Sequence, residues 1–137
     1  MTLSASSEEV LEHVANRQGT LSPPEQEVLW DMEERFWTSG ADSARATTAT
    51  NAVMIFPYPP GILQGDHIWD HLARSTGWRS VKLAQRRVTL CGDIAIITYR
   101  VSAEKMDVPI HEALCASTFL HDEDKWLRVS HQQTPIG

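Results

Sequence analysis

Residues 81–134 read VKLAQRRVTL, CGD, IAIITYRVSAE, KMDVP, IHEALCASTFLH, DED and KWLRVSHQQT, and their pattern is the strongest indication of the fold. In its long segments many apolar and polar residues alternate with a period of two, which is typical of β-strands. The short segments CGD and DED have the chemistry of hairpin turns. We therefore predict antiparallel strands over 81–90, 94–104, 110–121 and 125–134.

Upstream of these strands the period changes to that of an α-helix. Ser22 can cap a helix, Pro24 suits its first turn, and Gly40 supplies a stop, so a helix is expected over 24–39. Glu33 lies inside its apolar sector. The apolar members of this sector are Leu29, Trp30, Met32, Phe36 and Trp37.

Shorter elements connect this helix to the strands. We expect a second helix near 42–50, a strand at 52–57 and an irregular Pro-rich segment over 57–61. A third helix should open at Gly65-Asp66 and end near Gly77. Helices followed by a strand meander predict an α+β fold, with about three N-terminal helices on a strongly bent antiparallel sheet that encloses a pocket.

The strand patterns also predict a partner for the sheet. The run Ile94-Ala95-Ile96-Ile97 is apolar on both faces of its strand, so the face away from the helices needs a cover. A second copy of the chain is the simplest cover. We therefore expect a homodimer formed through the outer face of the sheet.

Composition restricts the classes of function. The 137 residues suffice for one core, so we expect a polar N-terminal arm over 1–22 and a single domain over 23–137. A formal net charge of −6 with dispersed basic residues argues against nucleic acid or a membrane as partner. Without a long apolar run or signal peptide, we expect a cytoplasmic protein.

Cofactor and metal motifs are also missing from the sequence. Cys91 and Cys115 form no CxxC pair and no cluster with zinc spacing, and no phosphate-binding glycine loop or nucleophile elbow occurs. His67 and His71 have a helical i, i+4 spacing that can bind metal, but a solvated helix face explains them better. We expect neither metal nor cofactor.

Several short stretches together resemble a known family. They are MEERFW (32–37), VMIFP (53–57) followed by Gly61, the helix-opening Gly65, TYR (98–100), WLR (126–128) and HQQTP (131–135). Over about 25–135 the chain is similar to the SnoaL-like branch of the nuclear transport factor two superfamily. That resemblance implies a cone-shaped fold with a pocket in the cone, commonly dimeric. The Tyr and paired Asp arrangement of its isomerases has no match here, so isomerase chemistry is not implied.

Two buried titratable groups are the candidates for catalysis. Glu33 lies on an apolar helix face, so either its pKa is raised by burial or a cation such as Arg100 pairs with it. It can therefore be a general base near the pocket or one half of a structural ion pair, and both interpretations stay open. His131 shares strand parity with Leu127 and Val129, which we assign inward. Its imidazole is either a hydrogen-bonded core group or an acid/base group.

Other residues are candidates for ligand contact. Tyr99 can present its hydroxyl to a ligand or satisfy it in the core, and Tyr58 can stand at the pocket mouth. Of His111 and Glu112, which have opposite strand parity, only one can line the pocket, and the sequence does not say which. Trp37 is one of five tryptophans that could wall an aromatic cavity or serve as core. The expected ligand-contacting set is Trp37, Tyr58, Tyr99, Glu112 and His131.

Three functions follow from this pattern. The leading hypothesis is a protein that binds a small organic molecule in a mostly apolar, aromatic-lined pocket. The alternative is an enzyme of the ketosteroid isomerase or polyketide cyclase type, which transfers a proton next to a carbonyl through a carboxylate or imidazole. A non-catalytic dimerisation module is the third possibility. An acid or base with a shifted pKa that faces the open cavity would indicate catalysis, and a cavity without such a group would indicate binding. A cone filled by side chains would indicate a dimerisation module.

Overall fold

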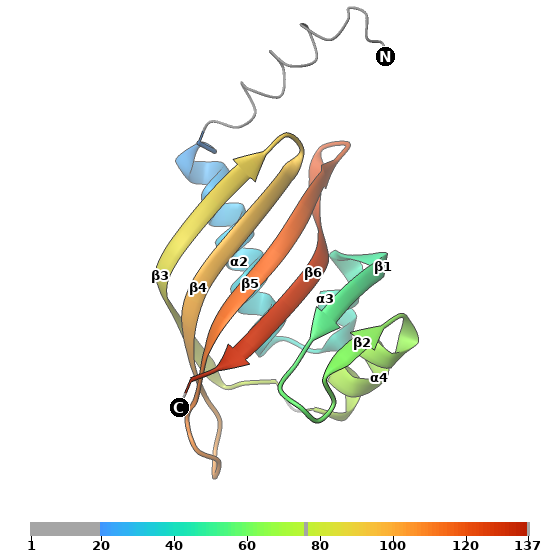
Figure 1. The fold of residues 1–137 in the computed structure, drawn as a ribbon, viewed down its shortest axis with the longest axis vertical. Coiled ribbons are helices and arrows are strands. Elements are labelled where there is room, and N and C mark those ends of the chain that lie inside the picture. The colour runs from blue at the N-terminus through green and yellow to red at the C-terminus, as the bar shows by residue number, and fades with distance from the viewer. Residues whose placement is uncertain (1–19, 76, 137) are drawn as a thin grey trace, which may run out of the picture.

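The computed structural model describes residues 20–75 and 77–136. Its helices are α2 (Pro23–Thr38), α3 (Ala41–Ala46) and α4 (Asp66–Arg74). Its strands are β1 (Thr48–Ile55), β2 (Ile62–Gln64), β3 (Ser80–Cys91), β4 (Ile94–Glu104), β5 (His111–Asp122) and β6 (Lys125–Pro135). They form one curved sheet in the order β2-β1-β6-β5-β4-β3 (Figure 1). The expected α+β layout is confirmed. Most of the expected N-terminal arm lies outside the described residues.

Helix α2 begins where the sequence predicts a cap. The Ser22 hydroxyl accepts a hydrogen bond from the Glu25 backbone N–H, and the Glu25 carboxylate accepts one from the Ser22 N–H, a reciprocal capping box. Pro23 and Pro24 fit the first turn, where a missing N–H costs no helical hydrogen bond. The helix lies behind the strands in Figure 1 and turns its apolar sector, with Glu33, toward the sheet. The carboxylate is thus forced into the interior.

The sheet is mixed rather than purely antiparallel. Strands β3 to β6 form the predicted antiparallel meander, but β1 pairs with β6 in parallel, with Met54 opposite His131. The parallel pairing is possible because the remainder of the domain connects these two strands. It brings the segment after β1 close to the end of β6.

Two short elements differ from the expectation. Strand β2, which the sequence analysis left out, pairs with β1 as a three-residue edge strand after the Pro-rich segment. Helix α3 ends at Ala46 rather than at residue 50, and β1 starts at Thr48. The Thr47 carbonyl accepts a hydrogen bond from the Arg128 N–H of β6, which directs the chain into the sheet. β-branched threonines also favour the strand.

The two faces of the sheet differ in their surroundings. Residues of β4 and β5 that face α2 are buried, among them Ile97, Val101 and Phe119, each 0% exposed. The opposite face carries part-exposed apolar side chains. These are Ile94, Ile96, Leu114 and Leu120. Among the described residues, no helix has both the length and the apolar character that a membrane crossing requires.

Candidate functional site

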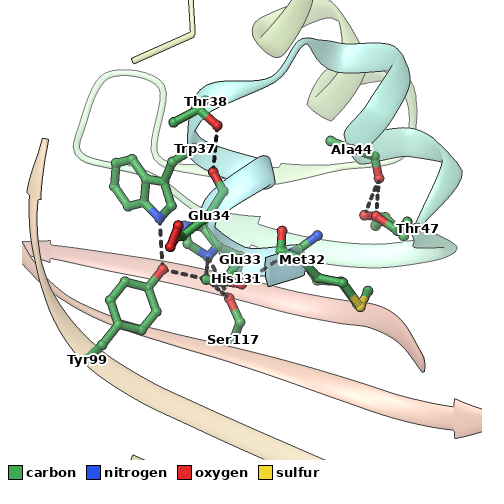
Figure 2. Close-up of polar contacts among 12 residues, drawn as sticks. Met32, Glu33, Glu34, Trp37, Thr38, Ala44, Thr47, Tyr99, Ser117 and His131 are labelled. Atoms are coloured by element: carbon green, nitrogen blue, oxygen red, sulfur yellow. Dashed lines mark hydrogen bonds and ion pairs between the residues drawn. The ribbon is translucent and has the colours of Figure 1, made fainter. Parts of the chain in front are cut away.

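A buried polar network lies between α2 and the inner face of the sheet (Figure 2). Glu33 of α2 is its centre and is 0% exposed. Its Oε1 accepts a hydrogen bond from Arg128 Nη2 at 2.9 Å, and its Oε2 accepts one from Ser117 Oγ at 2.6 Å. The Tyr99 hydroxyl also donates to Oε2 and accepts from Trp37 Nε1 at 2.9 Å. Both carboxylate oxygens are therefore occupied.

The surroundings of Glu33 keep it ionised. Burial alone would raise the pKa of this carboxyl, but the Arg128 charge and hydrogen bonds from His131 and Ser117 outweigh burial and hold the pKa well below its usual range. The same carboxylate acts on Tyr99, whose pKa is raised well above its ordinary value by burial and then by the Glu33 charge. Tyr99 therefore remains a neutral donor. The network is a buried ion pair in which both carboxylate oxygens accept hydrogen bonds.

His131 joins this network to residues nearer the end of the sheet. Its Nδ1 lies 2.8 Å from Ser117 Oγ and 3.3 Å from Glu33 Oε2, and its Nε2 lies 3.1 Å from Gln133 Nε2. Because the Gln133 amide nitrogen is a donor, Nε2 of the ring accepts and Nδ1 carries the proton. Burial lowers the pKa of His131 below 6.5 despite the Glu33 charge. The imidazole is thus neutral at pH 7.

The cation that pairs with Glu33 is Arg128, and the prediction of Arg100 as this partner is wrong. Arg100 points away from the interior and pairs with Glu112 at 2.7 Å, with both side chains 43% exposed. A register shift between Thr118 and Phe119, where β5 meets β6, explains the error, because Phe119 pairs with Arg128 and Thr118 with Ser130. Val129 is the extra residue of this bulge. Arg128 and His131 therefore face the same side, although strict alternation would separate them.

His131 does point inward, but the strand parity from which this was predicted is wrong. Leu127 and Val129 are only half-buried, whereas Arg128 is 0% and His131 1% exposed. Two Arg128 donors, Nε and Nη1, have no hydrogen-bond partner in the described part of the chain. The guanidinium carbon instead lies 4.4 Å from the Phe36 ring centroid and 5.0 Å from that of Phe119, so aromatic faces take the place of acceptors.

A cavity of about 360 Å³ lies beside this network. The end of α2, the segment after β1, helix α4, the start of β5 and the end of β6 all contribute to its wall. Aromatic and proline side chains make up much of the wall. They are Phe36, Trp37, Phe56, Trp78, Pro57, Pro59, Pro60 and Pro135. A volume near the lower end of the usual range for ligand pockets suits a small organic molecule.

The polar side chains of the cavity include one connected group, which we call the polar edge and define as Gln133, His111, Trp78 and Lys105. His111 Nε2 lies 3.2 Å from Gln133 Oε1, and the His111 ring stacks on Trp78 with centroids 5.5 Å apart at 17°. Lys105 Nζ lies 4.4 Å from the centroid of the Trp78 ring. Gln133 also bonds to His131, so it connects the polar edge to the buried network.

The predicted site residues fall into three places. Trp37 lines the cavity, whereas Glu33, Tyr99 and His131 are buried in the network and are not part of the cavity wall. Tyr58 stands 89% exposed on the Pro-rich segment, between residues that line the cavity. Glu112 belongs to the outer face with Arg100. Of the pair left open by the sequence, His111 faces the cavity, and Glu112 as a lining residue is a wrong assignment.

Sequence reasoning missed other lining residues. Lys105 belongs to the connection between β4 and β5, where no periodic pattern exists to orient a side chain. His71, expected on a solvated helix face, instead lines the cavity with its ring 4.9 Å from that of Phe56, and burial followed by the Arg74 charge lowers its pKa. Within the described residues no three His, Cys, Asp or Glu side chains gather as metal ligands.

Comparisons with known proteins bear on the fold. No protein-family model matches the sequence, and a search of curated proteins returns no significant match. Among solved structures, a candidate ketosteroid isomerase from Parabacteroides distasonis superposes with a TM-score of 0.70 at 12% identity, over 84% of this chain and 89% of its own. A candidate dehydratase of the NTF2-like family from Streptomyces avermitilis gives 0.66 at 15% identity, over 83% and 99%.

A hub homology domain has the same architecture. The CamKII hub homology domain of Chlamydomonas reinhardtii superposes with a TM-score of 0.69 at 13% identity, over 85% of this chain and 100% of its own. The chain thus has the nuclear transport factor two-like (NTF2-like) fold, as the sequence predicted. At these identities the likeness establishes the fold, and the function has to be argued from the site.

Proposed function

We propose that this protein binds a small, largely apolar organic molecule in the cavity beside α2. The observation that carries the proposal is the cavity wall, where several aromatic rings surround about 360 Å³ and a few hydrogen-bonding groups lie at one edge. Apolar walls with few placed polar groups are the usual composition of ligand sites. An aromatic ligand would stack on the indoles, and the polar edge would set its orientation.

The settings of Glu33 and His131, the two candidates for catalysis, favour binding over catalysis. Glu33 is committed to Arg128, Tyr99 and Ser117, and its depressed pKa makes it a weak base. His131 is held between Ser117 and Gln133 and does not reach the cavity. A catalytic base needs hydrogen-bond access to the substrate proton, which neither group has in this arrangement.

A cavity-filling variant tests the proposal. Leu72 lines the cavity and is half-buried, so Leu72→Trp should place a large side chain in the ligand volume. The purified protein is screened by thermal shift and calorimetry against aromatic and carbonyl-bearing compounds. We expect hits that raise the melting temperature of the wild type and lose at least tenfold in affinity in Leu72→Trp.

The matched control is Leu63→Trp. Leu63 is also half-buried against the core but is not part of the cavity wall. The Leu63→Trp variant should keep the wild-type affinity even if both variants lose some stability. Equal loss of affinity in the two variants, or no binding by the wild type across the library, would contradict the proposal.

We further propose that two copies associate through the outer face of β4 and β5. Support comes from Ile94, Ile96, Leu114 and Leu120, which leave 36 to 50% of their surface exposed on one sheet face. Among the solved structures that share the fold, one is named a hub homology domain and another a kinase association domain. Leu114→Glu should convert a dimer into a monomer in light scattering. Val108→Glu, an equally exposed site outside the sheet, should not.

A further inference from the structure

The charge of the cavity wall indicates the chemical class of the ligand. No carboxylate side chain belongs to the wall as described, although the whole chain has 18 acidic residues against 12 basic ones. The wall includes the ammonium group of Lys105. A cationic ligand that entered this cavity would lose its hydration and gain no counter-charge from the wall, which is costly in a partly enclosed site. The wall therefore disfavours cations.

The nearest buried carboxylate does not reverse this polarity. Glu33 is paired with Arg128 at 2.9 Å and lies in the core rather than in the wall. Its charge is compensated within the network, so an anion in the cavity would meet little opposing field. His131, between Glu33 and Gln133, is held neutral by burial and adds no charge.

The polar edge combines charge with a flat surface. Trp78 has the His111 ring stacked on it at 17° and Lys105 Nζ 4.4 Å from its centroid, so a cation and an imidazole lie close to one indole. His111 directs Nε2 toward Gln133 Oε1 and keeps its ring against the indole at this edge. A carboxylate at this edge would meet the Lys105 ammonium group, while Trp37 and Phe56 offer apolar surface to its ring.

We infer that the cavity takes a planar, mostly apolar organic anion, for which an aromatic carboxylate is the simplest chemistry. The inference rests on the proposed function and adds that the anionic group lies at the polar edge, beside His111 and Lys105. The ring of the ligand lies against the aromatic wall. Specificity arises because an uncharged analogue gains the same stacking without the charge-assisted contacts.

A matched ligand series tests this inference on the full-length protein. The probes are 2-naphthoate, 2-naphthalenemethanol and 2-naphthylmethylammonium, which share one ring system and differ in charge. Dissociation constants are measured by calorimetry at pH 7 and low salt. We expect 2-naphthoate to bind at least tenfold more tightly than the alcohol and the ammonium compound to bind more weakly than both.

Two lysine variants locate the effect. Lys105→Gln should reduce the preference for naphthoate over the alcohol at least threefold, whereas Lys82→Gln, the same charge change on exposed β3, should leave it unchanged. Equal effects of both variants would indicate long-range attraction and overturn the placement at the polar edge. Equal binding of naphthoate and the alcohol would overturn the inference but leave the proposed function standing. Failure of all three probes to bind, together with no hit in the wider screen, would refute the proposed function itself.

Discussion

The buried network around Glu33 and the polar edge around His111 contain similar chemical groups in opposite settings. In the network, the carboxylate contacts Arg128, Ser117 and Tyr99 and is 0% exposed. At the polar edge, His111 and Lys105 border a cavity. The strongly shifted pKa values of Glu33 and Tyr99 belong to the network. The two strongest of these pKa shifts therefore mark groups that stabilise the core, and the binding site is identified by its open volume.

Removing the cation of the network should have the largest effect. Arg128→Met leaves Glu33 charged and unpaired in the interior, so we expect a loss of about 3–5 kcal/mol in the free energy of unfolding. Urea denaturation measures it. The control Arg100→Met removes a half-exposed partner of Glu112 and should cost no more than about 1 kcal/mol. A similar cost for the two variants would mean that the network is not a stabilising centre.

Removing one hydroxyl from the network should cost less. Tyr99→Phe deprives Trp37 Nε1 of its acceptor and Glu33 of a donor, and we expect a loss of about 1–3 kcal/mol. Tyr58→Phe, at a side chain 89% exposed, should change stability by less than about 0.5 kcal/mol. Chemical denaturation of both variants decides whether buried hydrogen bonding sets the difference.

Acid should weaken the network through His131. Its pKa is lowered in the folded state, so below the ordinary value of 6.5 the unfolded chain binds a proton that the folded chain does not. Stability should fall as pH drops from about 7 toward 5, with this residue contributing a slope of up to about 1.4 kcal/mol per pH unit. Unfolding curves of His131→Gln should be flatter over this range. Equal slopes for the wild type and His131→Gln would contradict the assignment.

The polar edge should contribute least to stability. Lys105→Gln removes a cation near Trp78, a contact worth about 0.5–1 kcal/mol at a part-exposed site. We expect the free energy of unfolding to fall by less than about 1 kcal/mol, while ligand preference changes as described above. Parallel urea and calorimetric titrations separate the two effects. A loss as large as that of Arg128→Met would show that the two regions are energetically one.

The sequence predicted most of the architecture because periodicity directly reports which face of an element is apolar. It placed Glu33 in the interior and all four long strands to within about one residue. It failed at Arg128, because the bulge at Val129 reverses the alternation within a single strand. It also missed Lys105, because a side chain in a connection between strands has no periodic constraint. Both errors concern tertiary placement.

Trp37 belongs to both regions, since it lines the cavity and donates a hydrogen bond to Tyr99 in the network. Any replacement of it would disturb the core as well as the ligand wall. Trp78, His111 and Lys105 face the cavity without contacting Glu33 or Arg128. We therefore expect that, during evolution, changes in ligand specificity arise from substitutions at these three positions. Trp37 should stay conserved even between homologues that bind different ligands.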